Sequence, residues 1–327
     1  MRPDEAKAAV LEATVARMRE RVRGREADEL ETFVRRYYEH VAPEDLVERS
    51  DVDLCSAALA HSSLLRVRSP GEVKVHVYSP NVEEHGWECP HTVVETVVED
   101  MPFLVDSISM EVTRHGGAIH LVIRPILDIE RDDEGQLLAV ESGNGRPESL
   151  IHVEVDRVTD PAVLEQLRDD LLRVLGDVRA AVEDWSAMRE RTLAIATELS
   201  QQPLSDHAEA AEARELLLWM DAGNFIFLGY REYDIGSEGS EDVLRAVPGS
   251  GLGILREKGE QPVSVSFQAL PPEVRKLARE KNLLNLTKAN SRATVHRPSY
   301  LDYVGVKRFD SSGEVSGERR FLGPYTH

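Results

Sequence analysis

The sequence lacks several features that whole classes of protein require. Cysteine occurs only twice, at Cys55 and Cys89, which allows at most one disulfide and no zinc cage built from cysteines. No apolar run approaches the roughly 20 residues of a transmembrane helix. The first residues also lack the apolar core of a signal peptide. We therefore expect a cytoplasmic protein that has no membrane partner.

Positive charge is also scarce. The chain has 39 Lys and Arg against 59 Asp and Glu, a formal net charge of −20. Clustered cationic side chains are needed to neutralise nucleic-acid phosphates, and an anionic membrane surface attracts the same groups. The charge balance therefore argues against both partners. The eleven histidines show no metal-ligand spacing, so the sequence predicts no metal site.

The length of 327 residues and the hydrophobic fraction of 41% suffice for two or three domains with their own cores. We predict a helical N-terminal segment over residues 1–70, an α+β domain over 71–190 and a second α+β module over 191–327. In the second module, strands are expected at residues 225–230, 263–267, 293–296, 303–309 and 320–322, and helices beginning at residues 206 and 272.

The central domain is predicted to be a ferredoxin-like antiparallel sheet. The residue pattern predicts strands at 73–77 and 93–98, a helix at 104–115, strands at 119–129 and 151–155, and a helix at 162–185. The strand at 73–77 can fill the edge that a strand after the second helix would normally occupy. Both helices should cover one face, leaving polar side chains such as His152 and Glu154 on the other. Sequence alone leaves open whether that polar face meets solvent or an interface.

The loop that precedes the first helix of this domain is the most informative stretch. A helix N-terminus presents unpaired amides and a positive dipole end, which attract a carboxylate by roughly 0.3–1 kcal/mol. Asp100 can cap these amides itself, or the loop can bind a free amino acid, and both interpretations stay open. The effector-binding residues predicted under the second interpretation are Asp100, Met101, Pro102, Phe103, Arg124 and Arg231.

Two other motifs indicate structure rather than chemistry. Gly249–Gly253 superficially resembles a dinucleotide loop, but no helix start follows it, so we interpret it as a hairpin loop. Cys89 and His91 could bring a thiol and an imidazole together, but no orienting third group has a recognisable spacing, and we interpret this stretch as a structural loop. The sequence therefore predicts no catalytic residue and no cofactor-binding residue in this chain.

Four blocks, in order along the chain, carry a resemblance to a known family. They are Asp100–Ser107 (DMPFLVDS), Ser149–Arg157 (SLIHVEVDR), Asn224–Tyr233 (NFIFLGYREY) and His296–Lys307 (HRPSYLDYVGVK). Together they resemble the N-terminal region of the large NAD-specific bacterial glutamate dehydrogenases. The resemblance implies ACT-like domains that precede a distant catalytic domain, which oxidises glutamate to 2-oxoglutarate and ammonium. It also implies a large homo-oligomer whose activity responds to amino acids.

On this resemblance the chain is expected to be a regulatory and assembly region that is not catalytic by itself. Its partners would be its own catalytic domain, further copies of the chain and a small amino-acid effector, with NAD bound only in the full-length protein. The alternatives are a structural scaffold that binds nothing small and a free-standing enzyme. A pocket lined by Asp100, Arg124 or Arg231 would favour sensing, whereas a polar sheet face buried against another copy would favour the scaffold. Many amino-acid-binding ACT domains have a glycine where this chain has Phe103.

Overall fold

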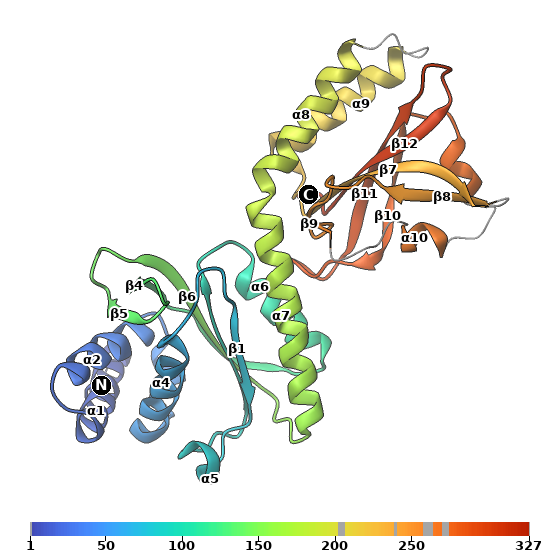
Figure 1. Cartoon of the computed structure of the whole chain (residues 1–327). Helices are drawn as coiled ribbons and strands as arrows, with labels where there is room; N and C mark the ends of the chain where they lie inside the picture. The colour runs from blue at the N-terminus through green and yellow to red at the C-terminus, as the bar shows by residue number, and fades with distance from the viewer. Residues whose placement is uncertain (1, 202–206, 239–240, 258–263, 270–274, 327) are drawn as a thin grey trace. The chain divides into compact units, whose positions relative to one another are not determined.

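The computed structural model describes residues 2–201, 207–238, 241–257, 264–269 and 275–326. It divides into two compact units, Met1–Gly176 and Asp177–His327, and the boundary falls inside helix α7 (Pro161–Glu183) (Figure 1). Within the described residues no helix, α7 included, is long and apolar enough to cross a membrane. The expected three-part division, with boundaries at residues 70 and 190, remains a prediction.

The first unit contains four N-terminal helices followed by one antiparallel sheet with its own helices. Its elements before α7 are α1 (Pro3–Arg21), α2 (Arg25–Tyr37), α3 (Pro43–Val47), α4 (Asp51–Leu65), β1 (Lys74–Tyr78), α5 (Val82–His85), β2 (Thr92–Glu99), α6 (Leu104–Arg114), β3 (Ile119–Ile123), β4 (Ile126–Arg131), β5 (Leu137–Val140) and β6 (Arg146–Val155). The strand order is β1-β2-β6-β4-β5, and β3 also pairs with β6. The early strand β1 therefore lies at the edge beside β2.

The single strand expected over residues 119–129 is wrong, because the structure breaks it into β3 and β4. The break falls at Arg124 and Pro125. Proline has no amide proton to donate to a strand ladder. Pro125 uses only its carbonyl oxygen, which accepts a hydrogen bond from the Leu150 amide at 3.0 Å. Both pieces still pair with β6, so the sheet continues across the interruption.

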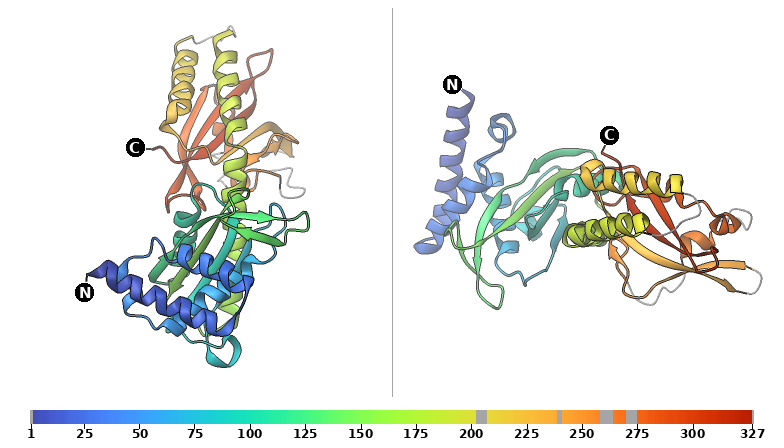
Figure 2. Two further views of the ribbon diagram at one scale, coloured as in Figure 1. Left: turned by 90° about the vertical axis from the view of Figure 1, so that its left-hand side faces the viewer. Right: turned by 90° about the horizontal axis from the view of Figure 1, so that it is seen from above.

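Helices cover both faces of this sheet, which corrects the expectation of helices on one face only. On one face, Val97, Leu121 and Leu150 share a buried core with Met18 and Phe33 of the N-terminal helices. Figure 2 shows these helices lying against the sheet. On the opposite face lie α6 and the first part of α7, and their apolar side chains Ile108 and Leu171 are buried. The polar side chains that alternate along β2 and β6 are therefore buried beneath the N-terminal helices of the same chain.

The second unit packs helices against a second antiparallel sheet. Its elements after α7 are α8 (Trp185–Gln201), α9 (His207–Trp219), the π-helix η1 (Met220–Asn224), β7 (Gly229–Glu238), β8 (Glu241–Ala246), β9 (Leu252–Gly253), α10 (Val265–Gln268), the 3₁₀-helix η2 (Lys276–Arg279), β10 (Leu284–Arg292), β11 (Tyr300–Phe309) and β12 (Val315–Gly323). The strand order is β10-β11-β12-β7-β8, with β9 beside β7. Ile195 and Leu217 from the helices share a core with Val304 and Phe321 from the sheet.

Several strand predictions for this unit need correction. The strand expected at 225–230 begins only at Gly229, and the strand expected at 293–296 is wrong because β10 ends at Arg292. Residues 265–267, expected in a strand, belong to helix α10 instead. Residues 206, 263 and 272–274, which belong to expected elements, lie outside the described residues. The strands expected at 303–309 and 320–322 are confirmed within β11 and β12.

Alanine should not be tolerated at Gly323 in β12. A Cβ there would lie 1.9 Å from the Ile226 carbonyl oxygen, a backbone atom that cannot swing away. We expect Gly323→Ala to lower the free energy of unfolding by about 1–3 kcal/mol. As a control, a Cβ added at Gly176 in helix α7 has no atom within 4 Å. Gly176→Ala should therefore raise the free energy of unfolding by about 0.5–1 kcal/mol. Urea unfolding measures both variants, and equal destabilisation would contradict the expectation.

Candidate functional site

The loop before α6 brings two of the predicted effector-binding residues into contact. The Asp100 carboxylate accepts a hydrogen bond from Arg124 Nη2 at 3.1 Å. Helix α6 begins at Leu104 without a capping side chain, so Asp100 does not cap it. Met101 is half-buried and Pro102 is exposed. The capping interpretation of Asp100 is therefore wrong, and its carboxylate forms an ion pair across the ends of β2 and β3.

The remaining two predicted residues differ in their surroundings. Phe103 has φ 72° and ψ 0°, the left-handed conformation that glycine adopts without strain and phenylalanine rarely adopts. The loop thus keeps a backbone suited to glycine although the side chain is a phenyl ring. Arg231 lies in β7 of the second unit, where its guanidinium is 3.8 Å from the Glu257 carboxylate. Its part in the same site stays a prediction.

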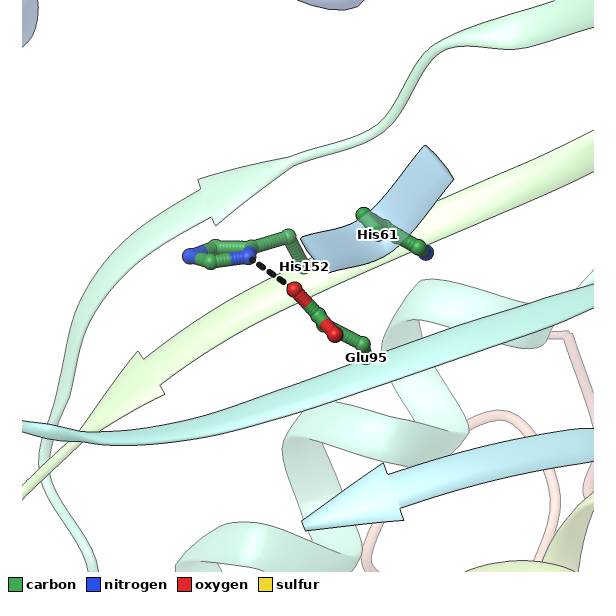
Figure 3. A group of neighbouring side chains, drawn as sticks. All are labelled: His61, Glu95 and His152. Carbon is green, nitrogen blue, oxygen red and sulfur yellow. Dashed lines mark ion pairs between the residues drawn. The ribbon is translucent and has the colours of Figure 1, made fainter. Parts of the chain in front are cut away.

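A buried polar network occupies the sheet face beneath α4, and sequence reasoning did not recognise it as a site. His152 in β6 stands directly opposite Glu95 in β2. Its Nδ1 lies 3.6 Å from Glu95 Oε1, and its Nε2 lies 3.4 Å from Glu154 Oε1 (Figure 3). All three side chains are buried. The alternation of His152 and Glu154 with valines was the available signal, but it does not show that helices cover them.

His61 in α4 approaches the network from the helical layer. Its Nε2 lies 3.1 Å from the Thr96 carbonyl oxygen, and its Nδ1 lies 3.0 Å from the Tyr37 hydroxyl. Because a carbonyl oxygen can only accept, Nε2 carries the proton and Nδ1 accepts from Tyr37. Burial lowers the pKa of His61 to about 4. The ring is therefore neutral at neutral pH, with both nitrogens hydrogen-bonded.

The other members of the network favour one another's charged forms. Burial opposes a charged His152, but Glu154 and Glu95 outweigh it and raise the pKa of His152. Burial also raises the pKa of Glu95, yet the imidazoles of His152 and His76 lower it overall to about 2. The pKa of Glu154 is lowered in the same way, because His152 and Arg49 outweigh its burial. The two carboxylates therefore favour the protonated form of His152.

Glu154 joins this network to a pocket at the surface of the first unit. Arg49, in the turn after α3, donates from Nη1 to Glu154 Oε1 at 2.5 Å and from Nη2 to Oε2 at 2.8 Å. His91 Nδ1 lies 2.9 Å from Oε2. The pocket has a volume of about 380 Å³, and its wall includes Trp87, Cys89, His91, His120, His152 and Glu154.

The thiol on this wall is not activated as a nucleophile. Burial raises the pKa of the Cys89 thiol to about 11. At neutral pH the sulfur is therefore protonated and a poor nucleophile. The orienting group that the sequence did not reveal for Cys89 and His91 is Glu154, 63 residues after His91. Strand pairing brings the three together, because Val93 in β2 lies opposite Glu154 in β6.

Comparison with known proteins places these features in a family. A family model described as "Glutamate dehydrogenase, ACT1 domain" matches residues 33–171, which contain the whole first sheet. The chain is 37% identical over 330 residues to the NAD-specific glutamate dehydrogenase of Halomonas elongata, which covers 99% of this chain and 20% of the relative. The chain belongs to the large NAD-specific glutamate dehydrogenase family.

Two further members of this family align over most of the chain. The NAD-specific glutamate dehydrogenase of Pseudomonas aeruginosa is 33% identical over 302 residues, covering 90% of this chain and 18% of the relative. That of Mycobacterium tuberculosis is 26% identical over 275 residues, covering 82% of this chain and 16% of the relative. The chain thus spans no more than 20% of the length of these glutamate dehydrogenases. A solved RNA-binding light-oxygen-voltage receptor aligns over 86% of this chain and 88% of its own at 10% identity, with a TM-score of 0.16 that supports no argument.

The family name includes NAD, but the glycine-rich loop of this chain does not fit a dinucleotide. Gly249–Gly253 leads from β8 into β9, which pairs with β7, and no helix begins at its end. A Cβ on Gly253 would lie 2.1 Å from the Leu228 carbonyl oxygen, so this glycine permits close strand packing. Its amide donates to the Asp184 carboxylate at 2.7 Å. A negatively charged phosphate would be repelled from that position.

Replacing His61 by glutamine should flatten the acid side of the pH–stability profile. The pKa of His61 falls from 6.5 to about 4 on folding, so between these values the unfolded state binds more protons and stability falls as the pH falls. Glutamine can keep the bonds to Thr96 and Tyr37 but does not titrate. As the pH falls from 6.5 to about 4, the free energy of unfolding of the wild type should decrease relative to that of His61→Gln by up to about 1.4 kcal/mol per pH unit. Urea unfolding followed by β2 amide signals tests this, and parallel profiles would contradict it.

Removing Arg49 should destabilise the first unit. Arg49→Met leaves Glu154, whose side chain is 2% exposed, without its guanidinium partner. We expect a loss of about 3 kcal/mol, the lower end for a broken buried ion pair, because His91 and His152 still contact the carboxylate. The control Arg25→Met removes an exposed pair with Glu29 and should change little. Chemical denaturation compares the two, and similar losses would show that the Glu154 pair is not special.

Proposed function

We propose that this chain is a regulatory and assembly region of an NAD-dependent glutamate dehydrogenase. The whole protein would oxidatively deaminate L-glutamate to 2-oxoglutarate and ammonium, with NAD bound outside residues 1–327. The observation that carries the proposal is the ACT1-domain match over residues 33–171, within an alignment that covers 99% of this chain. By itself the chain would not turn over glutamate, because neither the protonated Cys89 thiol nor the Gly249–Gly253 loop suits that chemistry.

The first sheet supports a permuted ferredoxin-like, ACT-like arrangement as part of this proposal. From β2 onwards the order is strand, helix, strand, strand, helix, if β3 and β4 count as one interrupted strand and the edge strand β5 as an addition. The early strand β1 pairs with β2 and would replace a strand after α7 at that edge. The N-terminal helices would then be an addition that closes the second face of the sheet.

The effector in this proposal is a small amino acid bound at the loop before α6. Asp100 and Arg124 present a carboxylate and a guanidinium 3.1 Å apart, with side chains 27% and 36% exposed. An amino acid carries one ammonium and one carboxylate, so it can replace this ion pair with two of its own. The α6 N-terminus, which has no capping side chain, adds attraction for the ligand carboxylate.

Assembly into a homo-oligomer and contact with the catalytic domain of the same protein complete the proposal. A pure scaffold was expected to use the polar sheet face between subunits. Helices of the same chain already cover that surface, because Leu54 and Leu65 of α4 belong to the core that lies on the same face as Val97. The sensing role therefore has more support from the geometry than a scaffold built on that face.

A thermal-shift screen of the chain against the twenty amino acids, 2-oxoglutarate and NAD tests the proposal. A ligand at about 100 times its dissociation constant stabilises a fold by roughly 2.7 kcal/mol. We expect a shift with one or a few amino acids that is lost in Asp100→Asn and Arg124→Met. The control Arg168→Met removes only exposed ion pairs with Glu165 and Asp169 and should keep the shift. No shift with any amino acid would refute sensing by this chain.

A further inference from the structure

We propose that Cys89, His91 and Glu154 form a binding site for a divalent transition metal ion such as Zn²⁺, on the wall of the 380 Å³ pocket. One ligand atom from each side chain, a sulfur, an imidazole nitrogen and a carboxylate oxygen, lies within 4.8 Å of the other two. The site is distinct from the loop at Asp100 and goes beyond the role in amino-acid sensing. It also replaces the sequence-based expectation that the chain has no metal site.

The backbone holds the three ligands on two paired segments. Cys89 and His91 are two residues apart in the short segment that leads into β2, with Pro90 between them. Glu154 lies in β6, and every residue of β2 is paired with a residue of β6. The ligand side chains therefore start from rigid, neighbouring backbone positions, which is the condition for a preorganised metal site.

The donor set suits Zn²⁺ in number and type. Thiolate, imidazole and carboxylate are the three ligand classes that zinc uses in proteins, and three protein ligands leave a fourth position open to water or a small molecule. The fourth position would face the pocket. Binding replaces the Cys89 S–H proton with the metal and releases that proton to water, while His91 binds as a neutral imidazole with its proton on the other ring nitrogen, so affinity should rise with pH.

The charge around the pocket favours a cation. Asp45, Glu48, Asp53 and Glu88 also line it, against the guanidinium of Arg49 and the imidazoles of His91, His120 and His152. Arg49 contacts both Glu154 oxygens, and His91 shares one of them. A metal ion bound between His91 Nδ1 and Glu154 Oε2 would keep this carboxylate neutralised, while Arg49 still donates to Glu154 Oε1.

His152 is a buried neighbour of the ligating carboxylate. Its side chain is 1% exposed, it lies on the wall of this pocket, and its Nδ1 faces Glu95 at 3.6 Å. Its Nε2 contacts Glu154 Oε1 at 3.4 Å. Such a neighbour orients a ligating carboxylate, and removing groups of this kind typically weakens metal binding about 10–100-fold.

Two other clusters in the described part of the chain have similar composition but are less suited to a metal. His61, Glu95 and His152 lie together, but both nitrogens of His61 already have hydrogen-bond partners. Glu111, His115 and Asp170 form the other cluster, in which arginine side chains already neutralise both carboxylates. The pocket cluster alone combines a thiol with an accessible open side.

Cobalt titration of the full chain tests the proposal, because Co²⁺ reports its ligands by colour. We expect a single equivalent of Co²⁺ to produce the near-ultraviolet charge-transfer band of a thiolate ligand, and Zn²⁺ to displace it. Cys89→Ser should remove the band and weaken Zn²⁺ binding at least about tenfold. Cys55→Ser, which changes the only other cysteine, buried in α4, is the matched control and should behave as the wild type.

A second variant keeps the test decisive if Cys89→Ser does not fold. His91→Gln leaves the thiol in place and should weaken Zn²⁺ binding while circular dichroism stays unchanged. The proposal is overturned if the wild type shows no thiolate band, if Cys89→Ser keeps it, or if Cys55→Ser loses it. None of these outcomes affects the amino-acid screen. The cobalt titration therefore tests the metal site alone, and the thermal-shift screen tests the sensing role alone.

Discussion

The pairing of β2 with β6 is the constraint on which the first unit depends. It places Glu95 opposite His152 on one face, while Val94 and Val153 form a pair on the other. Valines can be buried against helices without further cost, but charged groups lose their hydration and need partners of opposite charge. The N-terminal helical layer provides them, because Arg49 neutralises Glu154 at the edge of the same face. The N-terminal helices are thus required by the chemistry of the sheet they cover.

Glu154 connects the core of the unit with its surface. One carboxylate accepts from Arg49, contacts His152 in the network and contacts His91 on the pocket wall. A ligand that contacts this carboxylate changes the interaction that raises the pKa of His152. Binding at the pocket therefore affects groups that lie between the helical layer and the sheet, which is a physical route from a surface site to the packing of the first unit.

The two candidate binding regions lie at opposite ends of one strand. The segment with Cys89 and His91 leads into β2, and Asp100 follows its last residue. Eight extended residues span about 26 Å, so ligands at the two ends do not touch. Any influence of one on the other must pass through β2 and its neighbours. Because β2 is a central strand that pairs with both β1 and β6, it can transmit such an effect only through the packing of the whole sheet.

The sequence by itself determined the local elements of the central domain and its family. The apolar run in β2, the alternation in β6, the helical spacing of α6 and the four family blocks are properties of neighbouring residues, so they can be read without knowledge of the rest of the chain. The break between β3 and β4 also has a local cause, Pro125, although the alternation on both sides of it favoured one continuous strand. The left-handed backbone of Phe103 does not follow from the local sequence, because phenylalanine rarely adopts this conformation. Only the tertiary structure decided that helices bury the polar face and that His91 meets Glu154. Both depend on contacts between distant segments, and the alternation of polar residues is the same whether water or a helix lies above them.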